Sequence, residues 1–337
     1  MSNTSNIIRA GIDSYLVYDE ENTYNEELTS FAKTFGTLTS FDNNWNNNLN
    51  KIRGSTGGTL PSSNEETTSR DAQEILPGTA DGSMSLSIEP REFRWLKYVM
   101  GSESGDGTTA DSYNYPQASA TTDADKIKYL DIPSIGLSLN NLYGGTGDSA
   151  DSKILVRGAK INSATISGSS GEEITASVDI VYSEAEPETG VNTGVALPST
   201  SFYNFDDSEI EIPNGTSVSN TIQDFEISIE NGVSLRHGLR NRTAQDAVLG
   251  ERNFSLTITV DHESNEFVKD AIQAQNDYQP TVFDEVTIKL DNGTNTLIAH
   301  CKNCKLGDSN ISHSYPDIVT EPLNLEPELI WFEETLN

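Results

Sequence analysis

Residues that could do chemistry are few, and the clearest group is His300-Cys301-Lys-Asn-Cys304. Two thiolates at this spacing bind zinc when a second pair of ligands completes a tetrahedron. The sequence holds no second Cys-x-x-Cys pair, and His313 is the only nearby histidine that could join His300. A repeat within the chain aligns Cys304 with Ala159, a small residue on an expected strand. We therefore predict that the cysteines pack in the interior and that the chain uses no metal and no other cofactor.

Catalytic patterns are also weak. Paired carboxylates could serve as general acid and base, and they occur at Glu65-Glu66, Glu172-Glu173 and Glu333-Glu334. Such pairs arise by chance in a chain with 52 acidic residues, and no nucleophile elbow or phosphate-binding loop accompanies them. The Asp-rich stretches at 106–125 and 148–151 lack the ligand spacing of an EF-hand. The sequence therefore predicts a protein that is not an enzyme.

The charge balance is the strongest compositional signal. The chain has 52 Asp and Glu against 21 Lys and Arg, a formal net charge of −31. A surface of this sign repels nucleic-acid phosphates, so we expect no direct grip on DNA or RNA. The acids are spread along the chain, which favours a surface adapted to a high-salt cytoplasm over a local acidic site, although the second interpretation stays open.

One small basic island interrupts this acidity. Arg236, His237, Arg240 and Arg242 lie within seven consecutive residues. They could form a salt-bridge cluster within a loop or bind a phosphate. We favour a third interpretation, in which these cations face acids on a neighbouring subunit and set the register between two very acidic chains.

Alternating apolar and polar residues predict a mainly β protein. Thr221 to Glu230 and Phe254 to Val260 alternate as half-buried strands, joined by a loop at 231–251 and followed by a short helix at 263–274. An alternating strand also ends at Glu89, and Pro90 is expected to open a helix that stops at Gly101. Polar segments at 101–125 and 184–220 are expected to be exposed loops.

Several further strands are expected along the chain. Residues 161–166 and 174–182 form a predicted hairpin, and 286–290 pairs with 296–306 across Asp291-Asn292-Gly293, a type I′ signal. Leu323 to Phe332 is expected to be one closing strand. Phe41, Trp45 and Leu49 recur at a spacing that fits either a helix or a strand.

Two weak matches in the same order indicate an internal duplication. Arg70 to Gly78 resembles Arg242 to Gly250, and Ala159-Lys-Ile161 with Ile166-Ser167 aligns with Cys304-Lys-Leu306 with Ile311-Ser312. We predict an arm at 1–37, a first β module at 38–186, a connecting loop at 187–217 and a second β module with a C-terminal strand at 218–337. The polar start lacks the apolar core of a signal peptide, and no apolar run is long enough to cross a membrane.

Three passages resemble the tail tube proteins of long-tailed double-stranded DNA viruses: Arg70 to Gly101, Ile132 to Tyr182 and Ile212 to Asn231. The resemblance implies a β-sandwich or barrel-like subunit with a flanking short helix in each half. It implies hexameric rings that stack into the tube through which the viral DNA leaves. Expected partners are further copies, a tape-measure protein and tail-terminating or distal tail proteins. It places the protein in the virion tail, and in the host cytoplasm during assembly. Combined with the acidity, it suggests a virus of halophilic archaea.

A channel for DNA needs walls with acidic or hydroxyl side chains and few cations. Strand faces of this kind carry the candidate lumen-facing residues Ser85, Ser87, Asp224, Glu226, Glu230, Thr257 and Thr259. Each could equally belong to an ordinary outer surface. An alternative function is a distal-tail or adhesin-type module that contacts host glycans through the polar loops. A hydrolase using clustered acids has no motif in its favour.

Overall fold

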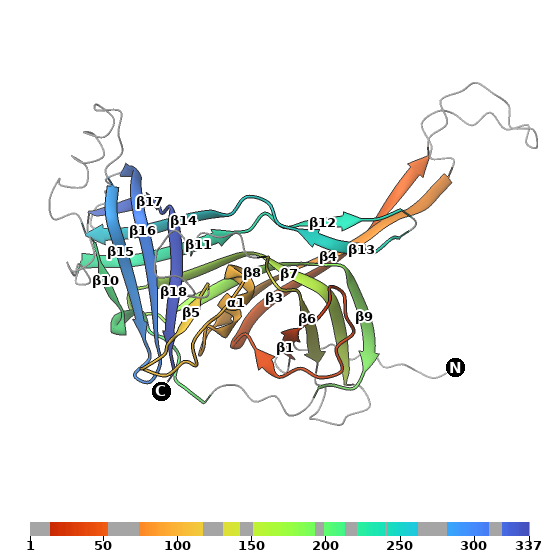
Figure 1. The fold of residues 1–337 in the computed structure, drawn as a ribbon, viewed down its shortest axis with the longest axis horizontal. Helices are drawn as coiled ribbons and strands as arrows, with labels where there is room; N and C mark the ends of the chain where they lie inside the picture. Colours follow the sequence, from red (N-terminus) through yellow and green to blue (C-terminus); the bar gives the residue numbers. More distant parts are fainter. Residues whose placement is uncertain are drawn as a thin grey trace, which may run out of the picture.

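The computed structural model describes residues 14–52, 74–116, 131–141, 151–192, 199–212, 221–239, 241–261, 282–309 and 319–336. Within these ranges the chain is mainly β, which confirms the predicted fold class (Figure 1). The elements are β1 (Ser14–Glu20), β2 (Lys33–Thr34), β3 (Thr37–Ile52), β4 (Glu74–Glu89), η2 (Arg94–Leu96), α1 (Lys97–Met100), β5 (Tyr113–Tyr115), β6 (Ile135–Asn141), β7 (Ser152–Ser169), β8 (Thr175–Tyr182), β9 (Glu184–Thr189), η3 (Phe205–Asp207), β10 (Glu209–Glu211), β11 (Ile222–Glu230), β12 (Ser234–His237), β13 (Ala244–Val248), β14 (Asn253–Asp261), β15 (Val282–Asp291), β16 (Thr296–Ser309), β17 (Thr320–Glu326) and β18 (Leu329–Thr335).

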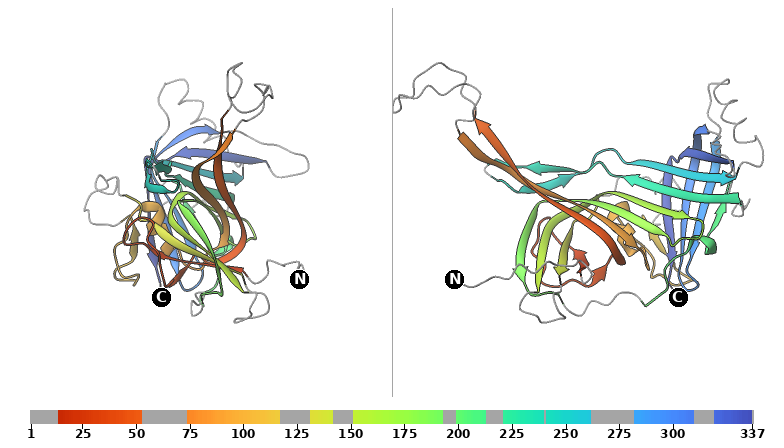
Figure 2. Two further views of the ribbon diagram at one scale, coloured as in Figure 1. Left: turned by 90° about the vertical axis from the view of Figure 1, so that its right-hand side faces the viewer. Right: turned by 180° about the vertical axis from the view of Figure 1, so that it is seen from behind.

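Strand β7 joins two layers. Its second half lies in a main sheet with the order β3-β4-β8-β7-β11-β14-β17-β16-β15-β10. Its first half lies in a small sheet with the order β2-β1-β6-β7-β9, below the main sheet in Figures 1 and 2. The bend falls at Gly158, whose φ of +60° suits glycine because a Cβ there would meet Ser183 and the Tyr24 ring at 3.0 Å.

The core fills the space between these layers. Alternation sends one side of each main-sheet strand inward, and Leu86, Val178, Ile166, Phe225 and Ile258 are all at most 1% exposed. Aromatic residues from the arm and the helix complete it, as Tyr18 packs on Phe35 (4.4 Å between centroids) and edge-on against Tyr98 (5.5 Å). Burial of these rings supplies much of the hydrophobic stabilisation of the fold.

The two halves of the chain repeat one topology, which confirms the predicted duplication. Strands β3-β4-β8-β7 in the first half and β11-β14-β17-β16 in the second half pair in the same order. Their irregularities also coincide, because β7 shifts register between Ile161 and Ser163 against β8, and β16 shifts between Leu306 and Asp308 against β17. β6 and β15 flank β7 and β16 on one side, and β9 and β18 flank them on the other.

The helix after β4 is shorter than predicted. The segment after Pro90 begins as the 3-10 turn η2 at Arg94 and becomes α-helical only over Lys97–Met100. It ends where predicted, because Gly101 adopts a left-handed conformation (φ +101°) and its N–H donates to Lys97 O at 2.8 Å. The predicted helix at 263–274 lies outside the described residues.

Polar segments expected to be loops contain strands. The 231–251 segment forms the β12–β13 hairpin, and β9 and β10 lie within 184–220. In the 101–125 segment, β5 pairs with β18 and Tyr115 is fully buried, so part of the expected exposed loop belongs to the core. Composition misled here because backbone pairing with a neighbouring strand needs few apolar side chains.

Two turns near the C-terminus also differ from the predictions. The β15–β16 connection has four residues between Asp291 and Thr296, held by Asn292 Oδ1, which accepts from the N–H groups of Thr294 and Asn295, so it is not a two-residue type I′ turn. The expected closing strand is two strands, β17 and β18, separated at Pro327. Phe41, Trp45 and Leu49 lie on strand β3, which settles their ambiguous spacing.

Candidate functional site: the polar face of the main sheet

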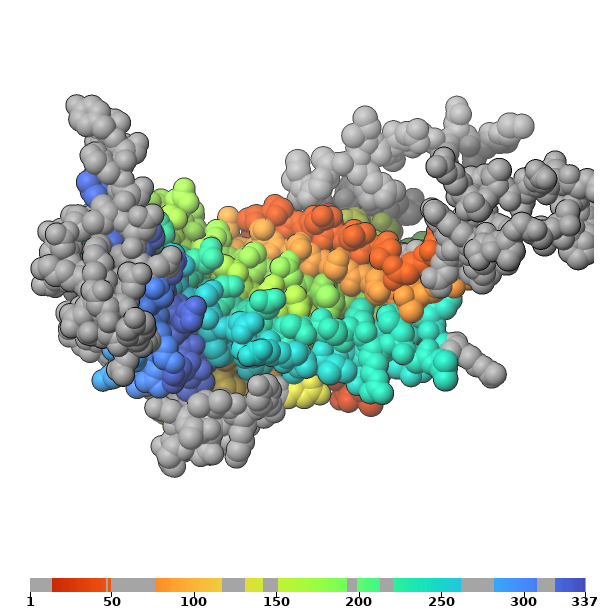
Figure 3. All heavy atoms as spheres, turned by 90° about the horizontal axis from the view of Figure 1, so that it is seen from above, coloured from red at the N-terminus to blue at the C-terminus, as the bar shows by residue number. Residues whose placement is uncertain are grey.

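From β3 across β4, β8, β7, β11 and β14 to β17, the outward side of the main sheet carries rows of polar side chains. Residues paired across antiparallel strands point to the same side, so the register assembles side chains from different strands into rows. The rows are Asp42, Ser85, Asp179, Ser163, Glu230 and Asn253; Ser40, Ser87, Ser177, Thr165, Ser228 and Ser255; Thr175, Ser167, Glu226, Thr257 and Asn324; and Ser169, Asp224, Thr259 and Pro322. We call this set the polar face. Figure 3 looks onto the sheet from above and shows its segments as adjacent bands from red to teal.

All seven candidate lumen-facing residues lie on this face. Ser85 and Ser87 come from β4, Asp224, Glu226 and Glu230 from β11, and Thr257 and Thr259 from β14. Strands β7 and β8 stand between these strands and make the face continuous, a contribution that was not predicted. The alternation of Ser163, Thr165 and Ser167 was visible in the sequence, but the side to which it turns depends on the pairing of β7 with both neighbours.

Hydrogen bonds tie the rows together. Asp179 accepts from Ser85 Oγ at 2.5 Å and from Ser163 Oγ at 2.8 Å, so one carboxylate spans three strands. Thr165 Oγ1 donates to Ser228 Oγ at 3.2 Å, and a hydrogen bond of 3.1 Å joins the hydroxyls of Ser167 and Thr175. Short hydroxyl side chains that bond to one another leave a low surface with few flexible groups.

The polar face carries carboxylates but no lysine or arginine. Its acids are Asp42, Asp179, Asp224, Glu226 and Glu230, and its remaining members are Ser, Thr, Asn and one Pro. The nearby cation Arg252 turns away from this face and donates to Val99 O and Met100 O on the core side. A surface of this composition repels a polyanion at long range and offers it no ion-pair partner at contact.

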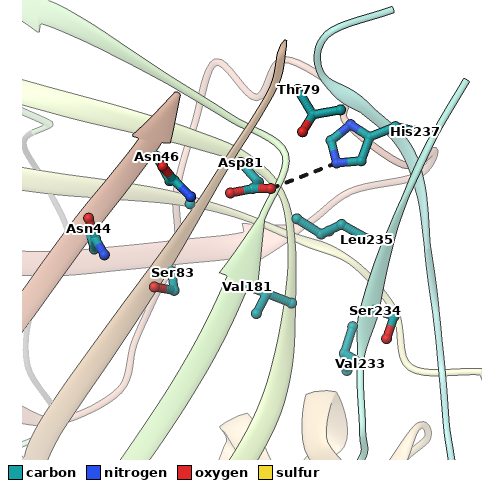
Figure 4. A pocket seen from close by; sticks show the side chains of 11 residues that line it. Asn44, Asn46, Thr79, Asp81, Ser83, Val181, Val233, Ser234, Leu235 and His237 are labelled. Atoms are coloured by element: carbon teal, nitrogen blue, oxygen red, sulfur yellow. Dashed lines mark ion pairs between the residues drawn. The ribbon is translucent and has the colours of Figure 1, made fainter. Parts of the chain in front are cut away.

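The basic island lies at the end of the β12–β13 hairpin, beside strand β4. His237 Nε2 is 3.8 Å from Asp81, and both residues line a polar pocket of about 460 Å³ (Figure 4). Arg242 Nε donates to Gly78 O at 2.9 Å, and Arg242 O accepts from Ala80 N at 2.8 Å. Arg236 is exposed, and Arg240 lies outside the described residues. Two members of the island thus contact their own chain, and pairing with another subunit stays a prediction that fits Arg236 best.

The cysteines are buried, as the packing interpretation predicts. Cys301 and Cys304 are fully buried free thiols, and Cys304 Sγ donates to Cys301 O at 3.3 Å. Burial raises the pKa of the Cys301 thiol well above its usual value and raises the pKa of Cys304 to about 12, which opposes the thiolate form that metals bind. His300 turns to the other side of β16, stacks on Trp331 and lies 2.9 Å from Glu285, while His313 lies outside the described residues.

Neither a metal centre nor a helical membrane span is found in the part of the chain that the structure describes. No three His, Cys, Asp or Glu side chains there are grouped so as to hold a metal ion. No helix there is long and apolar enough to cross a membrane.

Fold and surface together describe a structural β protein whose most extended feature is a polar sheet face. A protein-family model for the phage tail tube protein matches residues 11–324, and the chain belongs to this family. The expectation of a tail tube protein is therefore confirmed, and the protein is a structural component of a virion tail. No curated protein matches the sequence.

Proposed function

We propose that the protein assembles into closed rings that stack into the tail tube, with the polar face lining the channel through which double-stranded DNA is delivered. The continuity of the polar face across β3, β4, β8, β7, β11 and β14 carries this proposal. A wall made by separate patches would leave apolar or cationic gaps, whereas paired strands give an uninterrupted surface.

The chemistry of this face suits passage without binding. Duplex DNA carries one negative charge about every 1.7 Å of its axis, and proteins hold it chiefly through lysine and arginine contacts to phosphate. Carboxylates such as Glu226 and Glu230 repel the duplex, and the intervening hydroxyls exchange hydrogen bonds with water. The DNA therefore moves along the wall without specific contacts.

The other expectations for the tube belong to the same proposal. The resemblance implies hexameric rings of six subunits, a tape-measure protein inside the tube, and tail-terminating and distal tail proteins at its ends. Assembly takes place in the host cytoplasm. The net charge of −31 supports a host with a high-salt cytoplasm, such as a halophilic archaeon. Arg236 and the rest of the basic island would face acids of a neighbouring copy.

Electron microscopy of the purified protein tests assembly. We expect rings or tubes that increase with protein and salt concentration, since salt screens repulsion between acidic subunits. A protein that stays monomeric over the whole concentration and salt range would overturn the proposal. Copy number separates a tube subunit, which should be among the most abundant virion proteins, from a scarce adhesin.

Charge reversal tests the channel wall. In assembled tubes, Glu226→Lys adds a ring of cations to the polar face, and we expect DNA that enters the tube to be retained, with retention falling steeply as salt rises. The matched control is Asp207→Lys, another exposed acid, which lies on η3 and is not a member of this face. Equal DNA retention by the two variants would show that the polar face does not line the channel.

A further inference from the structure

Strand β5 is an addition to the second half of the protein. It pairs with the second edge of β18 through three residues, and Figure 1 shows the two strands side by side. Among the described residues, no strand pairs with the second edge of β9, which is the equivalent of β18 in the first half. Three paired residues give little backbone stabilisation, so β5 depends on its side chains to stay in place.

Glu334 on β18 lies at the centre of this contact. It is fully buried and lies opposite Tyr113 in the ladder between the two strands. Its carboxyl accepts hydrogen bonds from Tyr115 Oη at 2.8 Å and from Phe93 N at 2.6 Å, so it joins β5 to the turn that leads into η2. Tyr115 is also fully buried. Separation of β5 from β18 therefore removes a donor from the carboxyl and opens Glu334 to water.

Two charged groups face the Glu334 carboxyl from η2 and the turn before it. Glu92 opposes the ionisation of Glu334, and Arg94 favours it. The guanidinium of Arg94 is shared with other groups, because it pairs with Glu103 at 3.2 Å and lies 4.0 Å over the Tyr113 ring. The opposed charges leave burial as the largest influence on the pKa of Glu334, and burial favours the protonated acid.

Two tyrosines also lie close to this carboxyl. Tyr18 comes from β1 and Tyr203 from the segment before η3, and their hydroxyls are buried without a hydrogen-bond partner in the part of the chain that the structure describes. Burial raises the pKa of both phenols, so neither titrates where Glu334 does. Within the described residues, an ionised Glu334 thus has only the Phe93 and Tyr115 donors to stabilise its charge.

We propose that the Glu334 carboxyl is a proton-operated latch for the segment 102–116. With its proton, the side chain is neutral and holds β5, together with this segment, on strand β18. Without the proton, a charge is left among buried rings, and it becomes solvated when β5 separates from β18. Both partners belong to one chain, so the latch acts in the unassembled subunit and does not depend on the proposed ring assembly.

Two more contacts between this segment and the C-terminal residues lie next to Glu334. Leu336 N donates to Gly107 O at 2.7 Å, and the hydroxyls of Ser112 and Thr335 are 2.9 Å apart. Because these contacts follow directly after Glu334 in the chain, they open with β5. Release of the latch therefore exposes the backbone of the whole segment.

Hydrogen exchange tests the latch. The closed state binds the Glu334 proton more tightly, with a pKa of about 7 against 4.5, so opening rises with pH, by about tenfold between pH 6 and 8. We expect peptides within 102–116 to lose protection by this factor in the unassembled protein, after correction for the intrinsic exchange rate at each pH. Peptides from β7 should stay protected over the same exchange times. An equal loss of protection in β7 would show general unfolding and overturn the latch.

Variants of two neighbouring acids on β18 identify the group that titrates. Glu334→Gln keeps the size of the side chain and removes its titration, so the pH dependence of the 102–116 peptides should disappear. The matched control is Glu333→Gln, whose side chain is 40% exposed and which should exchange as the unmodified protein does. Burial also raises the pKa of Glu92, which is present in all three proteins and cancels in the comparison. A pH dependence that survives in Glu334→Gln would refute the proposal.

A disulfide lock tests whether separation of β5 is the event that exchange detects. Ser112→Cys/Thr335→Cys places two thiols at the positions of hydroxyls 2.9 Å apart, while the native thiols are buried. We expect the oxidised variant to keep the 102–116 peptides protected at pH 8, and reduction to restore their release. Loss of protection at pH 8 in the oxidised variant would contradict a movement of β5 away from β18.

Discussion

Phe41 and Phe225 hold equivalent places in the two halves of this protein, yet one is 38% exposed and the other 1%. Both follow the same register shift, both stand in an alternating strand, and both point to the apolar side of the main sheet. The strand beside them differs, because β11 has β7 on its second edge and β3 has no described neighbour there. Burial in a sheet is thus set by the neighbouring strand as much as by the residue.

The largest effect should come from truncating the buried member of this pair. Phe225→Ala removes a ring that is 1% exposed and stacks on Phe205 at 6.1 Å, so we expect a loss of about 3 to 5 kcal/mol in the free energy of unfolding. Phe41→Ala is the matched control and should cost the unassembled chain about 1 kcal/mol, because much of its ring already meets water. Chemical denaturation of both variants measures this, and equal losses would contradict the comparison.

A second contrast concerns β9 and β18, which occupy equivalent places beside β7 and β16 in the two halves. Thr189 lies opposite Ser152 and is exposed, whereas Glu334 lies opposite Leu297 and is fully buried. Glu334 accepts hydrogen bonds from Phe93 N at 2.6 Å and Tyr115 Oη at 2.8 Å. Burial outweighs these bonds and raises the pKa of Glu334 from 4.5 to about 7.

A raised pKa in an acid means that the folded state holds the proton more tightly than the unfolded state. The stabilisation is complete below about pH 4.5 and is lost as the pH rises through about 7, a change of about 3 kcal/mol. We expect Glu334→Gln to remove this part of the pH dependence, measured as unfolding free energies between pH 5 and 8. Burial also raises the pKa of Glu21, which is present in both proteins and cancels in the difference. The exposed Glu226→Gln is the control, and an unchanged pH slope in Glu334→Gln would refute the prediction.

A smaller effect is expected where the two halves already use similar residues. Cys304 and Ala159 are both fully buried, and each is paired with the strand that precedes it, Cys304 with Phe283 and Ala159 with Ile135. Cys304→Ala gives the second half the residue that the first half has at this place and removes one sulfur atom. It should cost about 1 kcal/mol of unfolding free energy. Thermal unfolding with and without added zinc measures this, and a zinc-dependent difference between the two proteins would contradict a packing role.

The smallest effect is expected on the polar face. Ser228→Ala removes one partly exposed hydrogen bond to Thr165, and the change in unfolding free energy should be about 0.5 kcal/mol or less. The equivalent residue in β3 is Asn44, and Asn44→Ala should be as mild. A loss above about 2 kcal/mol in either variant would show that this face is buried or strained and is no open wall.

Period-two alternation made much of the fold predictable. Residues from Ile222 to Glu230 and from Asn253 to Asp261 form the expected strands, and the hairpin of β7 and β8 is as predicted. The candidate face was also found in part, because short polar residues alternate with core residues in the same segments. Composition failed for β5 and β9 because backbone pairing with strands distant in sequence holds them, and it failed for the local β12–β13 hairpin because that pairing needs few apolar side chains.

The sequence by itself determined many of the strands, which side of each of these is polar, and that the chain contains two related halves, because these properties depend on residues close together in the chain. The tertiary structure alone decided that strands from both halves align their polar sides into one face, that Glu334 is buried while Thr189 is exposed, and that β3 has no neighbour on its second edge among the described residues. Those outcomes depend on which distant strands become neighbours. An alternating pattern shows that a strand needs a neighbouring strand, but only the folded sheet shows which strand that neighbour is.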